Sequence, residues 1–295
     1  MSSIWIFFTL MAAFMQAWRN AFQKQLSLTI DVYGVTLARF IFGFPFALLY
    51  VYILSINQVE PTQVTFTARY WLYIVVAGIS QITATALMVQ LFKQKNYAIG
   101  VGLAKSEAIL AAMIAAVMLN DQLTLLGWGG VILGGVAVFL LSQGNQKQQL
   151  SVQTLAIGIG SGLCFAMTSL LVREASLELT NLAYIDRAAW VLLSVITFQC
   201  FIMLLFLGIF RPKTLLAMWQ QKGLTFKVSV CSFLASLGWF TAMSMQSVAI
   251  VKTLGQIEIL FSLLISIFFF KEKLAKTEHI GLILVVIAAM FVIWA

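Results

Sequence analysis

An internal repeat constrains the fold of this chain more than any other feature of the sequence. When the sequence is shifted by 151 residues, positions 98–142 lie on positions 249–293 without a gap. Ten of these 45 pairs are identical: Ala98/Ala249, Ile99/Ile250, Leu103/Leu254, Glu107/Glu258, Ile114/Ile265, Leu123/Leu274, Gly130/Gly281, Ile132/Ile283, Leu133/Leu284 and Ala137/Ala288. Apolar helices match by chance at leucine or alanine, but not readily at a glutamate and a helix glycine in one register. The chain is therefore expected to consist of two related halves.

The composition identifies the environment of the chain. Hydrophobic residues make up 62% of the sequence and charged residues only 9%, whereas soluble domains carry about 25% charged residues. We therefore predict an integral membrane protein embedded in the lipid bilayer. The net charge of +8 does not indicate a nucleic-acid partner, because most basic residues lie in short connections beside apolar runs, where membrane topology explains them. The first apolar run lacks the features of a cleaved signal peptide.

The apolar runs predict an all-α fold with ten transmembrane helices. Each span needs about 20 mostly apolar residues, and the candidates are 3–22, 32–55, 70–92, 97–118, 124–142, 153–173, 183–209, 225–246, 249–270 and 277–294. The polar run 143–149 separates a first five-helix repeat, 1–150, from a second, 151–295. Five is an odd number, so the two repeats must cross the membrane in opposite directions. Inverted repeats of this kind are typical of transporters with a site near the bilayer midplane.

The distribution of basic residues predicts an orientation. Twelve lysines and arginines lie in or beside the odd-numbered connections, and two lie in the even-numbered connections and the termini. The positive-inside rule then places the odd connections in the cytoplasm and both termini outside. Arg19 and Lys24 are counted here with the first connection.

Two repeat-related glutamates are the leading candidates for a functional site. Glu258 is expected near the midplane of the ninth helix, where Gly255 and Ser262 would leave space around its carboxylate, and Glu107 has the same setting in the fourth helix. Ionisable groups inside a membrane are costly and are functional candidates by default. Either carboxylate could bind a proton or a cation. The alternative is a structural ion pair that holds two helices together.

Arginines at similar depths form a second candidate pair. Arg39 in the second helix and Arg187 in the seventh could bind a carboxylate or phosphate of a substrate, or each could neutralise a glutamate. Lys105 and Lys252 break the symmetry of the repeats, because Gln256 and Val101 stand at their equivalent positions. Lys252 lies close to a helix start and is interpreted as reaching toward water. Asp121 and Glu272 are interpreted as residues that close tight turns.

Aromatic and polar side chains complete the set of candidates. The faces of Trp18, Trp190 and Trp239 could hold a cation, although packing explains them equally well. Tyr184 and Gln16 are weaker candidates for the same cavity. Gln81, Thr83 and Thr85 place polar groups within the third helix and Gln90 lies near its end; some of these are expected to face the cavity, because lipid offers them no partner.

No feature of the sequence predicts an enzyme. The chain contains no HExxH, CxxC or P-loop pattern, so we expect no metal, no cofactor and no ATP-driven pump within it. Its single histidine, His279, is predicted at a water interface. Its three cysteines lie within apolar runs and are interpreted as small buried residues.

The repeated pattern resembles the drug/metabolite transporter superfamily, in particular its ten-helix EamA-type members. The pattern consists of an acid, a turn with a second acid and then a glycine; it runs Glu107, Asp121 and Gly130 in the first half and Glu258, Glu272 and Gly281 in the second. This chain departs from the family at Ala108 and Ile259, where proline is frequent, and at Asn120 and Lys271, where the turn glycine is frequent. The resemblance implies secondary transport of a small solute through a cavity that the fifth and tenth helices do not line.

Together these observations predict a secondary-active or facilitative transporter of a small organic metabolite, such as an amino acid or a similar zwitterion or cation. Its partners would be that solute and a coupled proton. A monomer or homodimer in a bacterial cytoplasmic (inner) membrane is expected. The alternatives are a transporter of quaternary ammonium compounds or drugs and a flippase for a lipid or lipid carrier.

Overall fold

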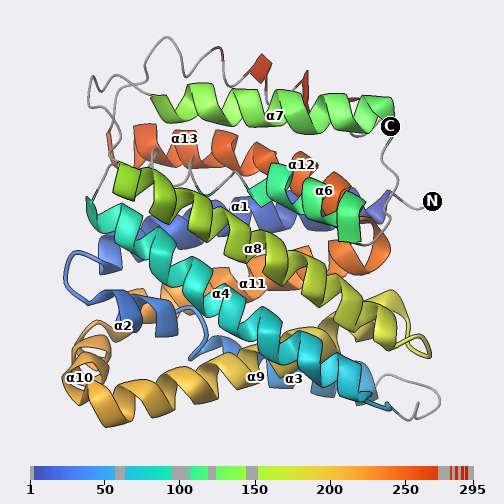
Figure 1. The fold of residues 1–295 in the computed structure, drawn as a ribbon. Helices are drawn as coiled ribbons and strands as arrows, with labels where there is room; N and C mark the ends of the chain where they lie inside the picture. The colour runs from blue at the N-terminus through green and yellow to red at the C-terminus, as the bar shows by residue number, and fades with distance from the viewer. Residues whose placement is uncertain are drawn as a thin grey trace.

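The computed structural model describes residues 3–56, 64–94, 104, 107–118, 124–143 and 152–271, together with seven positions between 280 and 291. All regular structure in these residues is helical (Figure 1). The first half contains α1 (Ile4–Leu26), α2 (Val32–Leu37), α3 (Gly43–Ile56), α4 (Ala68–Gln94), α6 (Glu107–Met118) and α7 (Leu125–Gln143). The second half contains α8 (Val152–Glu178), α9 (Tyr184–Phe210), α10 (Pro212–Gln220), α11 (Lys222–Met245), α12 (Val248–Leu254), the 3₁₀ turn η1 (Gly255–Ile257) and α13 (Glu258–Phe268).

The helices are long enough and apolar enough for a membrane. Five of the described segments meet both criteria: α4, α8, α9, α11 and the run from α12 through α13. The helix α1 is of similar length, with 23 residues, but carries buried polar residues such as Arg19, Asn20 and Gln23. The described positions of the tenth predicted helix are also helical. These properties, with the repeat, make the chain a multi-pass membrane protein.

Counterpart helices of the two halves run in opposite directions. In Figure 1, α1 begins near the N-terminus on the right and runs to the left, whereas its counterpart α8 runs from left to right. The helix α4 runs from right to left, and its counterpart α11 starts beside α10 on the left and runs to the right. The inverted arrangement that the odd number of helices predicts is therefore present.

Two of the predicted membrane helices are interrupted. The second is divided into α2 and α3 by turns at residues 38–42, because Pro45 removes a backbone donor and its ring clashes with the carbonyl group of Ile41. The hydroxyl group of Ser229 in α11 satisfies two backbone groups that the break leaves without helical partners. It accepts a bond from the Phe42 amide at 3.3 Å and donates to the Ala38 carbonyl at 2.5 Å. The ninth helix changes to the 3₁₀ turn η1 directly before Glu258.

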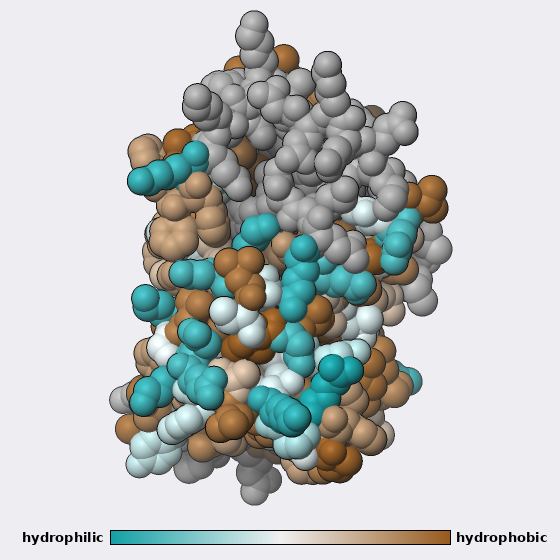
Figure 2. All heavy atoms as spheres, turned by 90° about the vertical axis from the view of Figure 1, so that its left-hand side faces the viewer, coloured by the Kyte–Doolittle hydropathy of each residue, from teal (hydrophilic) through white to brown (hydrophobic). Residues whose placement is uncertain are grey.

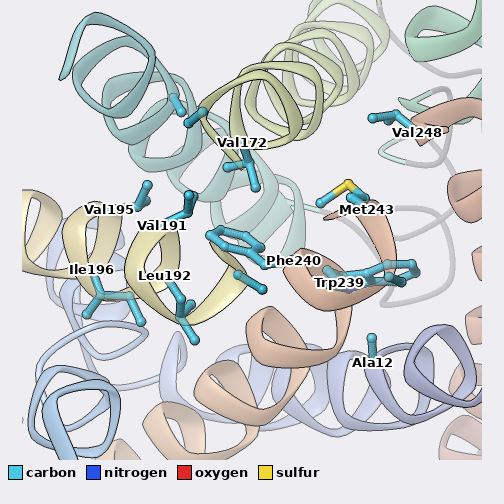
Figure 3. Packing of buried hydrophobic residues seen from close by; sticks show 14 of the residues in the cluster. Ala12, Val172, Val191, Leu192, Val195, Ile196, Trp239, Phe240, Met243 and Val248 are labelled. Carbon is cyan, nitrogen blue, oxygen red and sulfur yellow. The ribbon is translucent and has the colours of Figure 1, made fainter. Parts of the chain in front are cut away.

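Small residues let the helices approach closely. A side chain at Gly238 of α11 would lie 2.7 Å from the Phe8 carbonyl oxygen and 2.9 Å from Ala12 of α1, so these two helices touch through their backbones. Figure 3 shows the adjoining core, in which Trp239, Phe240 and Met243 of α11 pack beside Val172 of α8 and residues of α9. This rigid packing fixes the faces of α1 and α11 that carry the polar side chains described below.

One end of the bundle is polar. Figure 2 looks onto the end at which α2 and α10 lie, and hydrophilic side chains gather there among apolar ones. The residues between the predicted spans 183–209 and 225–246 are not an irregular connection, because most of them form the helix α10 and the first turn of α11. Pro212 begins α10, in the first-turn position that proline favours. The predicted turns at Asp121 and Glu272, as well as His279, lie outside the described residues.

Candidate functional site

The carboxylate of Glu258 lies fully buried where η1 meets α13. Two amide side chains of α1 donate to it: Gln16 Nε2 to Oε2 at 2.6 Å and Asn20 Nδ2 to Oε1 at 2.9 Å. Gln16 and Asn20 lie four residues apart and therefore on one face of their helix. Arg19 orients Asn20 from the other side through bonds of 2.7 and 3.2 Å to its Oδ1.

The carboxylate of Glu107 is held differently, although it occupies the equivalent position of the first repeat. Lys252 Nζ lies 2.8 Å from Glu107 Oε1, and both side chains are less than 10% exposed. Ser169 Oγ of α8 lies 3.0 Å from the same carboxylate oxygen. The expectation that Lys252 reaches toward water is therefore wrong, because α12 packs against α6 and a buried carboxylate lies within reach of its ammonium group.

Trp239 connects the two glutamates. Its indole Nε1 donates to Gln16 Oε1 at 2.8 Å, and the amide of Gln16 donates in turn to Glu258. The face of the same indole lies 4.3 Å from Lys252 Nζ, within the range of a cation–π interaction. A continuous series of contacts thus runs from Glu258 through Gln16, Trp239 and Lys252 to Glu107.

Gly255 makes room for this tryptophan. A Cβ atom at Gly255 would lie only 2.2 Å from Cη2 of Trp239, so the indole rests directly on the backbone of η1. The sequence-based expectation assigned this glycine to the space around the Glu258 carboxylate. The structure shows instead that the glycine admits the indole.

Two adjoining small cavities lie along these contacts. Glu107 and Glu258 both line the first, and Glu107, Arg39, Trp239 and Lys252 contribute to the second; Gln16 lines both. The second cavity has a volume of about 20 Å³, which is room for about one water molecule and not for a metabolite. The described residues therefore leave no room for a metabolite in either cavity.

Arg39 borders the second cavity at the break between α2 and α3. Its Nη1 donates to Thr85 Oγ1 at 2.7 Å, and its guanidinium lies 5.6 and 5.7 Å from the rings of Phe40 and Phe165. Its Nε is buried and has no hydrogen-bond partner within the described part of the chain. Gln81, one turn from Thr85, is buried in the same region and accepts a bond of 2.7 Å from Gln199 of α9. Of the polar residues predicted in the third helix, Gln81 and Thr85 are buried and Gln81 lines the second cavity, whereas Thr83 is exposed and donates to the Ile79 carbonyl at 3.0 Å.

Arg187 lies away from the two cavities and from Arg39, with which it was paired in the sequence analysis. Its Nε donates to the Leu182 carbonyl at 2.6 Å and its Nη2 to the Thr180 carbonyl at 2.8 Å, so it holds the turn between α8 and α9 at the end of the bundle. Tyr184 begins α9 near the same turn, where its carbonyl accepts a bond of 3.0 Å from Ser244. Neither residue lines the two cavities.

The other two tryptophans also lie away from the glutamates. The ring of Trp190 packs edge-on to Phe66 at 5.6 Å, and its carbonyl accepts a bond from the Tyr70 hydroxyl at 3.3 Å. Trp18 lines an apolar groove of about 160 Å³ between α1 and α13, together with Phe14, Phe261, Leu264, Ile265, Phe268 and Phe269. Of the three tryptophans, only Trp239 belongs to the polar site.

Several residues of the site were not predicted. Arg19 was counted with the first connection, but its side chain is 1% exposed. Ser169 was overlooked because a single polar residue in an apolar helix gives no pattern, and Asn20 was overlooked although it belongs to one. The spacing of Gln16, Arg19, Asn20 and Gln23 at intervals of three and four was an available signal for a polar face of α1. Within the described ranges, no three histidine, cysteine, aspartate or glutamate side chains gather into a group that could hold a metal.

An inverted helical bundle that buries two repeat-related carboxylates is typical of membrane transport proteins. The model of the EamA-like transporter family matches residues 3–143 and again residues 153–294, and the chain therefore belongs to this family, which is part of the drug/metabolite transporter superfamily. No curated protein matches. A solved structure titled "Crystal structure of protein" is similar in fold, with a TM-score of 0.69 and 13% identity over 99% of this chain and 96% of that chain.

Proposed function

We propose that this transporter carries a small organic solute with a protonated amine, such as an amino acid, by alternating access of the two repeats. The observation that supports this most directly is the series of contacts that joins Glu107 and Glu258 through Trp239. Buried carboxylates and an indole face are the groups that bind an organic ammonium in a low-dielectric site. The carboxylates could also bind a coupled proton.

Arg39 supports a zwitterion over a simple cation. Its guanidinium borders the same cavity as Glu107 and Trp239, and a guanidinium pairs with a carboxylate through two parallel bonds. The α-carboxylate of an amino acid would thus find Arg39 while its ammonium finds Glu107 or Glu258. A cavity of this small volume fits an occluded state, which a carrier passes through between its two open states.

The proposed setting is a bacterial cytoplasmic membrane, with the polar end of the bundle in the cytoplasm and the protein acting as a monomer or homodimer. We propose no enzymatic activity. Two other substrates remain candidates. The indole of Trp239 would also accept a quaternary ammonium, and the apolar groove beside Trp18 favours a lipid or lipid carrier.

The test is thermal stabilisation of the purified protein by a panel of amino acids, quaternary amines, nucleosides, organic anions and lipid headgroups. A ligand present at 100 times its dissociation constant stabilises the folded state by about 2.7 kcal/mol. We expect amino acids to raise the melting temperature. We expect Glu258→Gln to abolish both this shift and transport into liposomes, while the melting temperature without ligand stays near that of the wild type.

Glu178→Gln is the matched control, because Glu178 ends α8 and accepts a bond from Thr67 outside the cavities. This variant should retain the ligand response. Loss of folding in Glu258→Gln would make Glu258 a structural residue. A response to quaternary amines or lipid headgroups alone would replace the amino-acid proposal by one of the alternatives.

A further inference from the structure

The ammonium group of Lys252 occupies a complete binding site for a cation. It lies 2.8 Å from Glu107 Oε1 and 4.3 Å from the centre of the Trp239 ring. Ser169 Oγ contacts the same carboxylate oxygen at 3.0 Å. These groups come from four helices, α6, α8, α11 and α12, so the site is built by the tertiary fold.

The lysine has no counterpart in the first repeat. The repeat offset of 151 places Val101 opposite Lys252, whereas Glu258 corresponds to Glu107. The carboxylate of Glu258 accepts hydrogen bonds from the amides of Gln16 and Asn20. Lys252 also lies three residues before η1, and its flexible stem carries a compact charge that can move without repacking of the helices.

An empty carrier must close and return across the membrane without a substrate. If Glu107 were then left without a cation, closure would bury an unpaired charge, which is strongly unfavourable. We propose that Lys252 is a tethered stand-in for the substrate: its ammonium fills the site formed by Glu107, Ser169 and Trp239 when the carrier is empty, and the substrate's ammonium displaces it on binding. This inference rests on the proposed function.

The geometry also defines the class of substrate group. Lys252 contacts Glu107 at hydrogen-bonding distance, and only an ammonium that carries N–H donors can reproduce that contact. A quaternary ammonium has no such donor. The displaced group is therefore best matched by the primary ammonium of an amino acid or a related amine.

The consequence for transport is that the empty carrier can reorient, so net flux needs no counter-substrate. Lys252→Met removes the stand-in but leaves Glu107 and Trp239 for the substrate. In liposomes that contain the purified variant, we expect exchange of labelled for unlabelled substrate to persist. Net uptake into empty liposomes should fall by roughly 100-fold, since the cost of leaving one partner of a buried pair alone corresponds to at least that factor.

The substrate used is the amine that gives the largest melting shift for the wild type. Lys222→Met is the matched control, because Lys222 is an exposed lysine at the start of α11, and its ratio of net uptake to exchange should equal that of the wild type. A Lys252→Met variant with a normal ratio refutes the proposal. A folded variant that has lost exchange as well also refutes it, because Lys252 would then be required for substrate binding itself.

Lys252→Arg tests the same idea if the methionine variant does not fold. Arginine keeps the charge and binds a carboxylate through two bonds, so it should compete more strongly with the substrate. We expect KM for exchange to rise about tenfold with an unchanged maximal rate. An unchanged KM refutes the competition. If the wild-type protein moves no amine by exchange or by net uptake, the proposed function itself is contradicted. This outcome is distinguishable from the results of the Lys252→Met and Lys252→Arg variants, which are compared with an active wild type.

Discussion

A single methyl group at Gly255 should disturb the whole site. In Gly255→Ala, the new Cβ would lie 2.2 Å from Cη2 and 2.7 Å from Cζ3 of Trp239. Optimal carbon–carbon separations are about 3.5–4.0 Å, so the indole would have to move by more than about 1 Å. Its movement is restricted, because the ring is 4% exposed and contacts Lys252 on one face and Gln16 through its Nε1.

The size of the effect follows from this restriction. Overpacking of a well-packed core typically costs 1–3 kcal/mol, and a displaced indole would also weaken its bond to Gln16, for about 1 kcal/mol more. We therefore expect Gly255→Ala to destabilise the protein by roughly 2–4 kcal/mol. Gly208→Ala is the matched control, since nothing lies within 4 Å of a Cβ at Gly208 in α9, and alanine should stabilise that helix by up to about 1 kcal/mol.

The assay is thermal melting in detergent, with the double variant Gly255→Ala/Trp239→Phe as the decisive comparison. Phenylalanine is smaller than tryptophan and gives the methyl group room, so the double variant should melt higher than the sum of the single effects predicts. If Gly255→Ala melts like the wild type, or if the two effects simply add, the indole does not rest on Gly255 and the described site is wrong.

Other residues allow further tests in the same preparations. Lys271 adopts a left-handed backbone conformation, with φ of 56°, which costs a non-glycine residue about 1–2 kcal/mol; Lys271→Gly should raise the melting temperature, and a decrease would contradict the strain. Arg39→Ala and Arg187→Ala should separate binding from stability. Loss of Arg39 should raise KM for amino acids, whereas loss of Arg187 should lower the melting temperature and leave KM unchanged, because its bonds hold only the turn before α9. Equal effects on KM would contradict this division.

The sequence predicted the architecture well because the bilayer restricts what apolar segments can do. Length and hydropathy located the spans, and the repeat fixed their inverted relation. The sequence prediction missed the interruption of the second helix, although Pro45 was a visible signal for it. The resemblance implied a turn glycine at the position of Lys271, and the positive φ of this residue is a backbone conformation that glycine adopts without strain.

The partners of the site residues could not be predicted in the same way. Glu107 and Glu258 stand at equivalent positions of the repeats, but Lys252 and the pair Gln16 and Asn20 reach them from helices far away in the sequence. Whether a lysine near a helix start reaches water or a carboxylate depends on which helix packs against it. The fold places α12 against α6, and this tertiary contact decides between the two outcomes for Lys252.

The asymmetry of the two glutamates is the feature that a transport cycle can use. Lys252 can fill the Glu107 side from within the protein, while the amides of Gln16 and Asn20 orient Glu258. The face of the Trp239 indole contacts Lys252, and its Nε1 donates to Gln16. A substrate that displaces Lys252 from the indole would therefore act on Glu258 through Gln16.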